Sequence, residues 1–140
     1  MFHKNYEQRL QSWSCLRQKL ETAADPFQEV IDFYKQAPYV SIHTDPWHQD
    51  VWPDPWELVY ENQYDEFCTV LGMCYSLQLT DRFKGSEFEI HICTLESLSY
   101  MFLLFVDNYV LGYDNKKKVL KKDLPMDLQS QTVYAMPKLN

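Results

Sequence analysis

The sequence predicts an α+β domain in which helices come first and an antiparallel sheet follows. Apolar residues recur every three or four positions through most of the first 80 residues, the spacing of helices with one buried face. After residue 86 the spacing changes to two, because Phe88, Ile90 and Ile92 alternate with Glu87, Glu89 and His91, as in a strand with one solvent-exposed face. His91 is therefore expected at the surface. The chain has 140 residues and is 46% hydrophobic, which suffices for one packed core. We therefore expect a single domain over residues 1–140, with a helical part (1–80) and a sheet part (81–140).

Two amphipathic helices are expected at the start of the chain. The first covers residues 2–23, and its apolar stripe consists of Phe2, Tyr6, Leu10, Trp13, Leu16 and Leu20. The second begins after Asp25, which can cap a helix whose first residue is Pro26, and it ends before Pro38. Both helices should place their apolar stripes against a common core.

A tryptophan-rich loop and a short helix come next. Residues 39–53 contain prolines, aspartates and two tryptophans without a clear period, which indicates an ordered loop held by aromatic side chains. Asp54, Pro55 and Glu57 then combine a capping carboxylate, a proline at the first helical position and an acid three residues after the cap. This pattern predicts a helix from residue 55 to about residue 61.

The most apolar segment of the chain is expected to be a central helix. It is capped by Asn62 or Asp65, continues to about residue 79 and has almost no polar face, so it should be buried on nearly all sides. Gly72 lies in its middle and lowers the local helix propensity by up to ~1 kcal/mol relative to alanine. We expect this glycine to allow close packing against a neighbouring element.

Turns divide the second half of the chain into strands. Turn residues at 84–86, 107–108 and 114–116 bound an alternating segment (87–92), an apolar run (100–106) and the return arm of a hairpin (109–113). Residues 119–120 continue the pattern, and residues 132–136 fit an edge strand before Pro137. The central helix is therefore predicted to pack on an antiparallel sheet of about four strands.

Composition excludes several functional classes. A net charge of −7 disfavours the broad basic surface that nucleic-acid binding requires. The apolar runs are far shorter than the roughly 20 residues of a membrane helix. The four cysteines form no CxxC pair, and we interpret them as reduced thiols in a soluble cytosolic protein. Neither nucleic acid nor membrane is an expected partner.

Potential metal ligands gather in one loop. They are His43, Asp45, His48, Asp50 and Asp54. Their spacing matches no zinc signature, and aspartates at such positions usually cap helices or stabilise turns. We therefore expect neither a metal site nor a cofactor.

Two other groups of residues are candidate contact surfaces for a partner protein. Lys116, Lys117 and Lys118, followed by Lys121 and Lys122, concentrate positive charge that suits an acidic partner, although lysines also protect solvated sheet edges. Trp47, Trp52 and Trp56 are side chains of the kind that anchor interfaces, and they fit the core equally well. The sequence does not decide between these alternatives.

The middle of the chain resembles a known enzyme family. Several segments follow one another in a set order: VIDFYKQAPYV, Trp52, PWEL, NQYDEF at the start of an apolar helix, and then YMFLLFVDNYVLGYD. This order is similar to that of the bacterial transglutaminase-like cysteine peptidases. The resemblance covers roughly residues 28–120. It implies a transglutaminase/papain-like core, with the catalytic cysteine at the start of the central helix and the catalytic histidine at the start of a strand.

The residues that the resemblance places at these positions are not catalytic ones. The nucleophile falls near Tyr64 or Asp65, the histidine falls near Ser99 or Tyr100, and only Asp114 matches an orienting acid. Cys68 lies about one turn further into the helix, where burial would raise the pKa of its thiol. We expect a pseudoenzyme, and the alternative is a cysteine hydrolase or acyltransferase that uses Cys68, His91 and Asp114.

A second resemblance suggests where such a protein acts. The segments RLQSWSCLRQKLETAADPFQEV, FYKQAP and WPDPWELV are similar to an uncharacterised family of small proteins from tailed phages. The resemblance implies a non-catalytic phage protein that works by protein–protein interaction, either as a structural or assembly component of the virion or as a binder of a host protein. Its expected location is the host cytoplasm or the virion.

Overall fold

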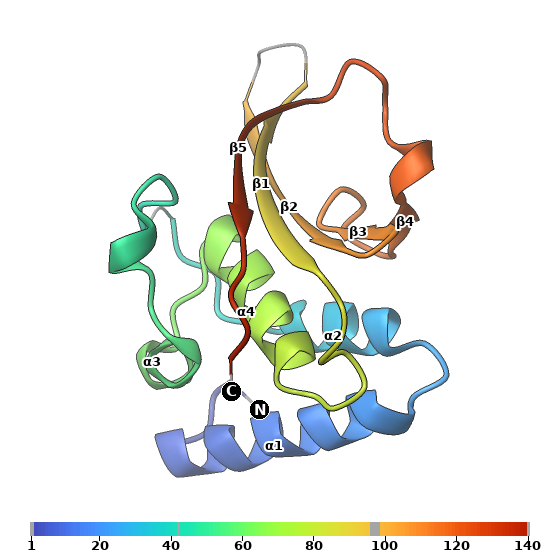
Figure 1. Ribbon diagram of the computed structural model, residues 1–140. Coiled ribbons are helices and arrows are strands. Elements are labelled where there is room, and N and C mark those ends of the chain that lie inside the picture. The colour runs from blue at the N-terminus through green and yellow to red at the C-terminus, as the bar shows by residue number, and fades with distance from the viewer. Residues whose placement is uncertain (1, 42, 96–98, 140) are drawn as a thin grey trace.

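The computed structural model describes residues 2–41, 43–95 and 99–139, and it has a layer of helices on which a twisted sheet stands (Figure 1). The α-helices of these residues are α1 (Tyr6–Thr22), α2 (Pro26–Tyr34), α3 (Pro55–Glu61) and α4 (Glu66–Gln78). Short 3-10 helices lie at Gln49–Val51 and Lys121–Asp123. The strands are β1 (Phe88–Thr94), β2 (Tyr100–Val106), β3 (Tyr109–Leu111), β4 (Val119–Leu120) and β5 (Gln129–Ala135).

The sheet has the strand order β4-β3-β2-β1-β5, and all its pairs are antiparallel. The predicted α+β order, with helices first and antiparallel strands second, is confirmed, but the described sheet has five strands where about four were expected. The edge strand expected at residues 132–136 is β5, which begins earlier, at Gln129, and pairs with β1 with a register shift between Ile92 and Cys93. The earlier start was not predicted because residues 129–131 are polar and give no apolar signal, although Gln129 and Ser130 pair with β1 through the backbone.

The helix starts follow the caps: the start of α1 differs from the prediction, and the start of α4 matches one of the two predicted caps. α1 begins at Tyr6 because Asn5 and Gln8 form a reciprocal capping box, so residues 2–5 precede the helix. α4 begins after Asp65, which accepts a hydrogen bond from the Cys68 amide. Asn62, the other candidate cap, instead ends α3 in a left-handed conformation with φ of 54°.

The central helix α4 is buried as predicted, with α1, α2 and α3 around it and the sheet on its remaining side (Figure 1). It packs closely at Gly72, where an added Cβ would lie 2.6 Å from a ring carbon of Tyr34. The close packing expected of this glycine is therefore confirmed. The contact brings the Tyr34 ring of α2 against the α4 backbone.

Ser76 joins three helices one turn after Gly72. Its hydroxyl donates to the Gly72 carbonyl at 2.8 Å and accepts from the Trp13 indole at 2.9 Å. Because that donation uses the only hydroxyl hydrogen of Ser76, the Tyr34 hydroxyl, 3.0 Å away, is the donor in their hydrogen bond. The buried polar groups of α1, α2 and α4 thus satisfy one another.

The sheet has a covered second face, which the alternation in β1 did not predict. Ile90, Leu104 and Leu111 face the helices and belong to the main core. On the other face, Cys93, Leu103, Phe105 and Val110 form a smaller cluster that residues between 113 and 128 cover through Tyr113, Leu124 and Leu128. The β1 face that was expected to be wet is therefore largely buried near its centre.

Replacing Gly72 with alanine is expected to destabilise the protein. The new methyl group would overlap the Tyr34 ring, and overpacking of this kind costs about 1–3 kcal/mol, while the gain in helix propensity offsets up to ~1 kcal/mol of it. Denaturant unfolding at equilibrium measures the difference. The matched control is Gly85→Ala, where no atom lies within 4 Å of the added Cβ and the change should be within ~0.5 kcal/mol. A Gly72→Ala variant as stable as the natural protein would contradict the expected overlap.

Candidate functional site

A cavity of about 420 Å³ opens between α2, the first half of α4, the start of β2 and the turn after β3. Its buried lining includes Ile31, Val70 and Met73, and its exposed edge carries tyrosine, carboxylate and lysine side chains. The described residues that line it are Ile31, Tyr34, Lys35, Tyr39, Glu66, Thr69, Val70, Met73, Ser99, Tyr100, Met101, Phe102, Gly112, Asp114 and Asn115. The cavity therefore combines an apolar floor with a polar and aromatic edge.

Three exposed aromatic residues, Tyr39, Tyr100 and Trp47, form what we call the aromatic rim. Tyr39 and Tyr100 line the cavity and are 71% and 53% exposed, and Trp47 packs edge-on against Tyr100 with ring centroids 5.2 Å apart. Tyr39 is held in place because the segment around it pairs with Tyr64, through Val40 N to Tyr64 O (3.1 Å) and Tyr64 N to Pro38 O (3.2 Å). The backbone thus fixes one side of the rim to the start of α4.

Asp65 ties the tryptophan-rich loop to the N-terminus of α4. One carboxylate oxygen accepts from the backbone N–H groups of His43 and Thr44 at 2.9 and 3.0 Å, and the other accepts from Cys68 N at 2.7 Å. Burial raises the pKa of this carboxyl, but the hydrogen bonds from Thr44, Cys68 and His43 outweigh that effect and leave the pKa below its usual value. The ionised carboxylate is therefore the stable form at this position.

Cys68 is enclosed in the core. It is 0% exposed, and its thiol donates to the Thr44 hydroxyl at 3.2 Å. Burial raises the pKa of the Cys68 thiol to about 12, so the thiolate is scarce at neutral pH. An enclosed thiol of this kind is poorly suited to nucleophilic catalysis.

His91 and Asp114 do not join Cys68 in one site. Cys68 and Ile90 belong to the main core on the helical side of the sheet, whereas His91 stacks on Phe105 of the opposite face, with ring centroids 3.8 Å apart. Both His91 ring nitrogens are hydrogen bonded, to Ser130 at 2.7 Å and to Glu89 at 3.1 Å. The strand expected to present a surface histidine instead buries it, because the ring packs against Phe105 and is hydrogen bonded to Ser130 of β5.

Of the three residues Cys68, His91 and Asp114, Asp114 alone lines the cavity. Its carboxylate accepts from the Lys116 amide at 2.8 Å and so stabilises the turn after β3. Ser99 and Tyr100, near which the resemblance places the histidine, line the same cavity. Glu66, Lys35 and Tyr39 were not singled out from the sequence, because their role depends on the meeting of α2, α4 and β2.

The three tryptophans have different environments. Trp52 is packed between Phe67 and Tyr134, each with ring centroids 4.8 Å away, so it serves the core. Trp56 is 48% exposed on α3 and meets Trp13 edge-on at 6.0 Å. Trp47 belongs to the aromatic rim, so only Trp47 and Trp56 present substantial surface to a partner.

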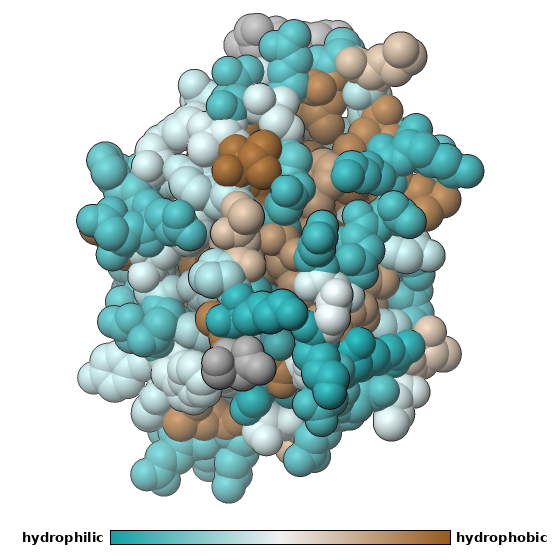
Figure 2. All heavy atoms as spheres, viewed as in Figure 1, coloured by the Kyte–Doolittle hydropathy of each residue, from teal (hydrophilic) through white to brown (hydrophobic). Residues whose placement is uncertain are grey.

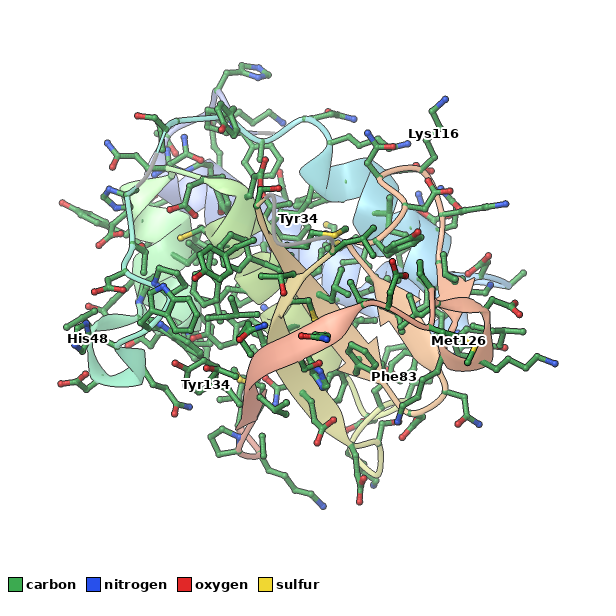
Figure 3. The ribbon with its side chains drawn as sticks, turned by 90° about the horizontal axis from the view of Figure 1, so that it is seen from above. Tyr34, His48, Phe83, Lys116, Met126 and Tyr134 are labelled. Carbon is green, nitrogen blue, oxygen red and sulfur yellow. The ribbon has the colours of Figure 1, made fainter. Side chains whose placement is uncertain are left out.

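The lysines of residues 116–118, which we call the lysine segment, also have different environments. Lys116 and Lys117 are exposed, and Lys116 extends away from the molecule (Figure 3). Lys118 forms an ion pair with Asp25 at 2.8 Å and lies over the rings of Phe27 and Tyr109. It therefore joins the turn before β4 to the start of α2.

The histidines of the tryptophan-rich loop are paired with acidic residues. His43 lies 3.2 Å from Glu61, and His48 is paired with Asp45. Within residues 2–41, 43–95 and 99–139, no group of three or more His, Cys, Asp or Glu side chains is arranged to hold a metal ion. In the same residues, none of the helices combines the length and apolar character needed to cross a membrane.

Apolar side chains are scattered over the face shown in Figure 2, where hydrophilic side chains separate small apolar areas. The cavity and its aromatic rim differ from that pattern because they place exposed rings beside a buried apolar floor.

Comparisons of the chain with protein-family models, with curated proteins and with solved structures find no match in any of the three.

Loss of the Asp65 carboxylate is expected to destabilise the protein. Asp65→Ala removes a helix cap and leaves buried amides without their acceptor, which should cost at least about 2 kcal/mol in unfolding free energy. Because the folded pKa is depressed, the contribution of the charge is fully present above about pH 3.9, the unfolded value, and is lost as the pH falls through the folded pKa.

Asp65→Asn separates the charge from the shape of this side chain. Unfolding measured from neutral to acidic pH should show a smaller loss of stability on acidification in Asp65→Asn than in the natural protein. The exposed Asp127→Asn variant is the control and should follow the natural protein. Parallel pH curves for Asp65→Asn and the natural protein would contradict the role assigned to the charge.

Proposed function

We propose that this chain is a non-catalytic protein that binds another protein through the cavity and its aromatic rim. The observation that carries the proposal is the lining of the cavity, which is open and aromatic and includes neither cysteine nor histidine among its described residues. Cysteine catalysis needs a reactive thiolate and a neighbouring base. Recognition needs only a shaped surface with apolar anchors and well-placed polar groups.

The fold that we propose is a degenerate transglutaminase-like core. The resemblance places the catalytic histidine near Ser99 or Tyr100 and the orienting acid at Asp114, and these residues line one cavity. The position of the nucleophile, near Tyr64 or Asp65, immediately precedes Glu66, and Glu66 also lines this cavity. Because these positions meet at one cavity, they support a site whose shape is retained although its catalytic residues are replaced.

The alternative is a cysteine hydrolase or acyltransferase that uses Cys68, His91 and Asp114. The thiol of Cys68 is enclosed in α4 on the helical side of the sheet, whereas His91 lies on the opposite face, and both facts argue against it. We further propose a tailed-phage setting, as the second resemblance implies. The partner is then a component of the virion or a protein of the infected host.

Thiol labelling of the native protein distinguishes the two functions. Cys15 is exposed and should react rapidly at neutral pH, while Cys68, Cys74 and Cys93 are buried and should react only on unfolding. Mass spectrometry of the digested protein locates the label. In Cys15→Ser, the native protein should remain essentially unlabelled. Fast modification of Cys68 in that variant would contradict the non-catalytic function and support the cysteine-enzyme alternative.

Partner capture tests the proposed binding surface. The natural protein is used as bait with extracts of phage-infected cells and with disrupted virions, beside two variants that each lose two exposed aromatic rings. Tyr39→Ala/Tyr100→Ala removes two residues of the rim, and Trp56→Ala/Tyr60→Ala removes two from α3. A specific partner should be lost, by at least about tenfold, only from the rim variant.

The same experiment can contradict the proposal in a definite way. Loss of the partner only from the α3 variant would move the binding surface to α3. Equal capture by all three proteins would exclude both aromatic surfaces as determinants of binding. Circular dichroism and thermal unfolding of each variant check that a loss of capture does not reflect unfolding.

A further inference from the structure

The aromatic rim is suited to contact with a cation. Tyr39 and Tyr100 present exposed rings at the mouth of the cavity, and Trp47 extends the aromatic surface behind Tyr100. The faces of such rings carry negative electrostatic potential, which attracts ammonium and guanidinium groups within about 6 Å. The protein already uses this contact elsewhere, since Lys118 lies 5.4 Å from the ring centre of Tyr109.

Two carboxylates add negative charge to the same cavity. Glu66 reaches it from the first turn of α4, and Asp114 reaches it from the turn after β3. Neither forms an ion pair with a lysine, arginine or histidine of the described residues. Lys35, the only described cation in the lining, is engaged with Asp32 at 3.5 Å. A positively charged ligand would therefore complement the cavity.

An anionic ligand is disfavoured by the way α4 begins. Helix N-termini commonly attract anions through free amides, but here the Asp65 carboxylate occupies the Cys68 amide and the neighbouring loop amides. Glu66 then places a second carboxylate beside this helix end. Lys116, the nearest exposed lysine of the segment after Asp114, extends away from the molecule (Figure 3).

The floor of the cavity suits an apolar stem. Ile31, Val70 and Met73 are buried side chains that line it below the charged and aromatic edge. Lysine and arginine side chains combine several methylene groups with a terminal cation, so they can cover apolar surface while the charge stays near water. A cavity with an apolar floor and a negative aromatic mouth matches both parts of such a side chain.

We propose that the cavity receives a lysine or arginine side chain of the partner protein. Its methylene groups lie against Val70 and Met73, and its cationic end lies between the aromatic rim and the carboxylates of Glu66 and Asp114. This inference rests on the proposed binding function and specifies the chemistry of the partner. The partner therefore presents an exposed basic residue in the contact.

Short glycine-rich peptides with blocked ends provide the test. One peptide carries a central lysine, a second carries arginine, a third carries the uncharged norleucine and a fourth carries glutamate. Each is titrated into the isotopically labelled protein to about 10 mM, and amide NMR shifts are followed, which covers millimolar dissociation constants. The basic peptides should shift amides that line the cavity, including those of Thr69 and Gly112, and the norleucine and glutamate peptides should bind more weakly.

Charge variants locate the effect. Glu66→Gln/Asp114→Asn keeps the size of both side chains and should weaken binding of the lysine peptide about tenfold. The matched control, Glu87→Gln/Asp127→Asn, removes the same charge from two exposed positions outside the cavity lining and should retain the natural affinity. Equal weakening by both double variants would overturn a specific cation site.

Other outcomes separate this inference from the proposed function. Norleucine binding as tightly as lysine, or glutamate binding more tightly, would overturn the inference even if partner capture still depends on Tyr39 and Tyr100. Absence of shifts with both basic peptides at about 10 mM would overturn it as well. Failure of the proposed function appears instead as rapid labelling of Cys68 or as partner capture that does not depend on the aromatic rim.

Discussion

The contact between Gly72 and Tyr34 is the constraint on which the rest of the structure depends. The Tyr34 ring lies where a side chain at residue 72 would project, so α2 and α4 approach more closely than two larger residues would permit. Ser76 then links Tyr34 to Trp13 of α1 and to the α4 backbone. Because α2 and α4 also form two walls of the cavity, the packing of the core sets the shape of the candidate site.

Asp65 shows how a polar residue can serve structure at a position where the resemblance implies chemistry. Its carboxylate caps α4 and holds the backbone at His43 and Thr44, which brings the tryptophan-rich loop against the helix start. A thiolate at this place could not satisfy so many donors in the same geometry. The carboxylate of Asp65 thus orders the loop and the helix start next to Glu66, which lines the cavity.

The sheet illustrates why alternation in a single strand can mislead. Glu89 and His91 alternate with isoleucines, a pattern typical of one wet face. The chain nevertheless covers that face with Tyr113, Leu124 and Leu128, which are distant in sequence. His91 is accommodated there because Ser130 and Glu89 satisfy both ring nitrogens while Phe105 supports the ring.

The sequence by itself determined the order of the elements and much of the core. Asp54 and Pro55 define the start of α3 through local backbone chemistry, and the apolar circumference of α4 requires burial wherever its partners lie. The close packing at Gly72 follows from the cost of a glycine within a helix. Each of these features follows from a local pattern of residues, even where the contact that it predicts is made with a distant segment.

Only the tertiary structure decided the membership of the candidate site. Tyr39, Glu66, Tyr100 and Asp114 come from four separate segments, and no local pattern links them. The different roles of Trp52 and Trp47 depend likewise on whether Phe67 and Tyr134 or solvent lie beside them. Long-range packing brings such groups together, so the sequence could supply the candidates but not their arrangement.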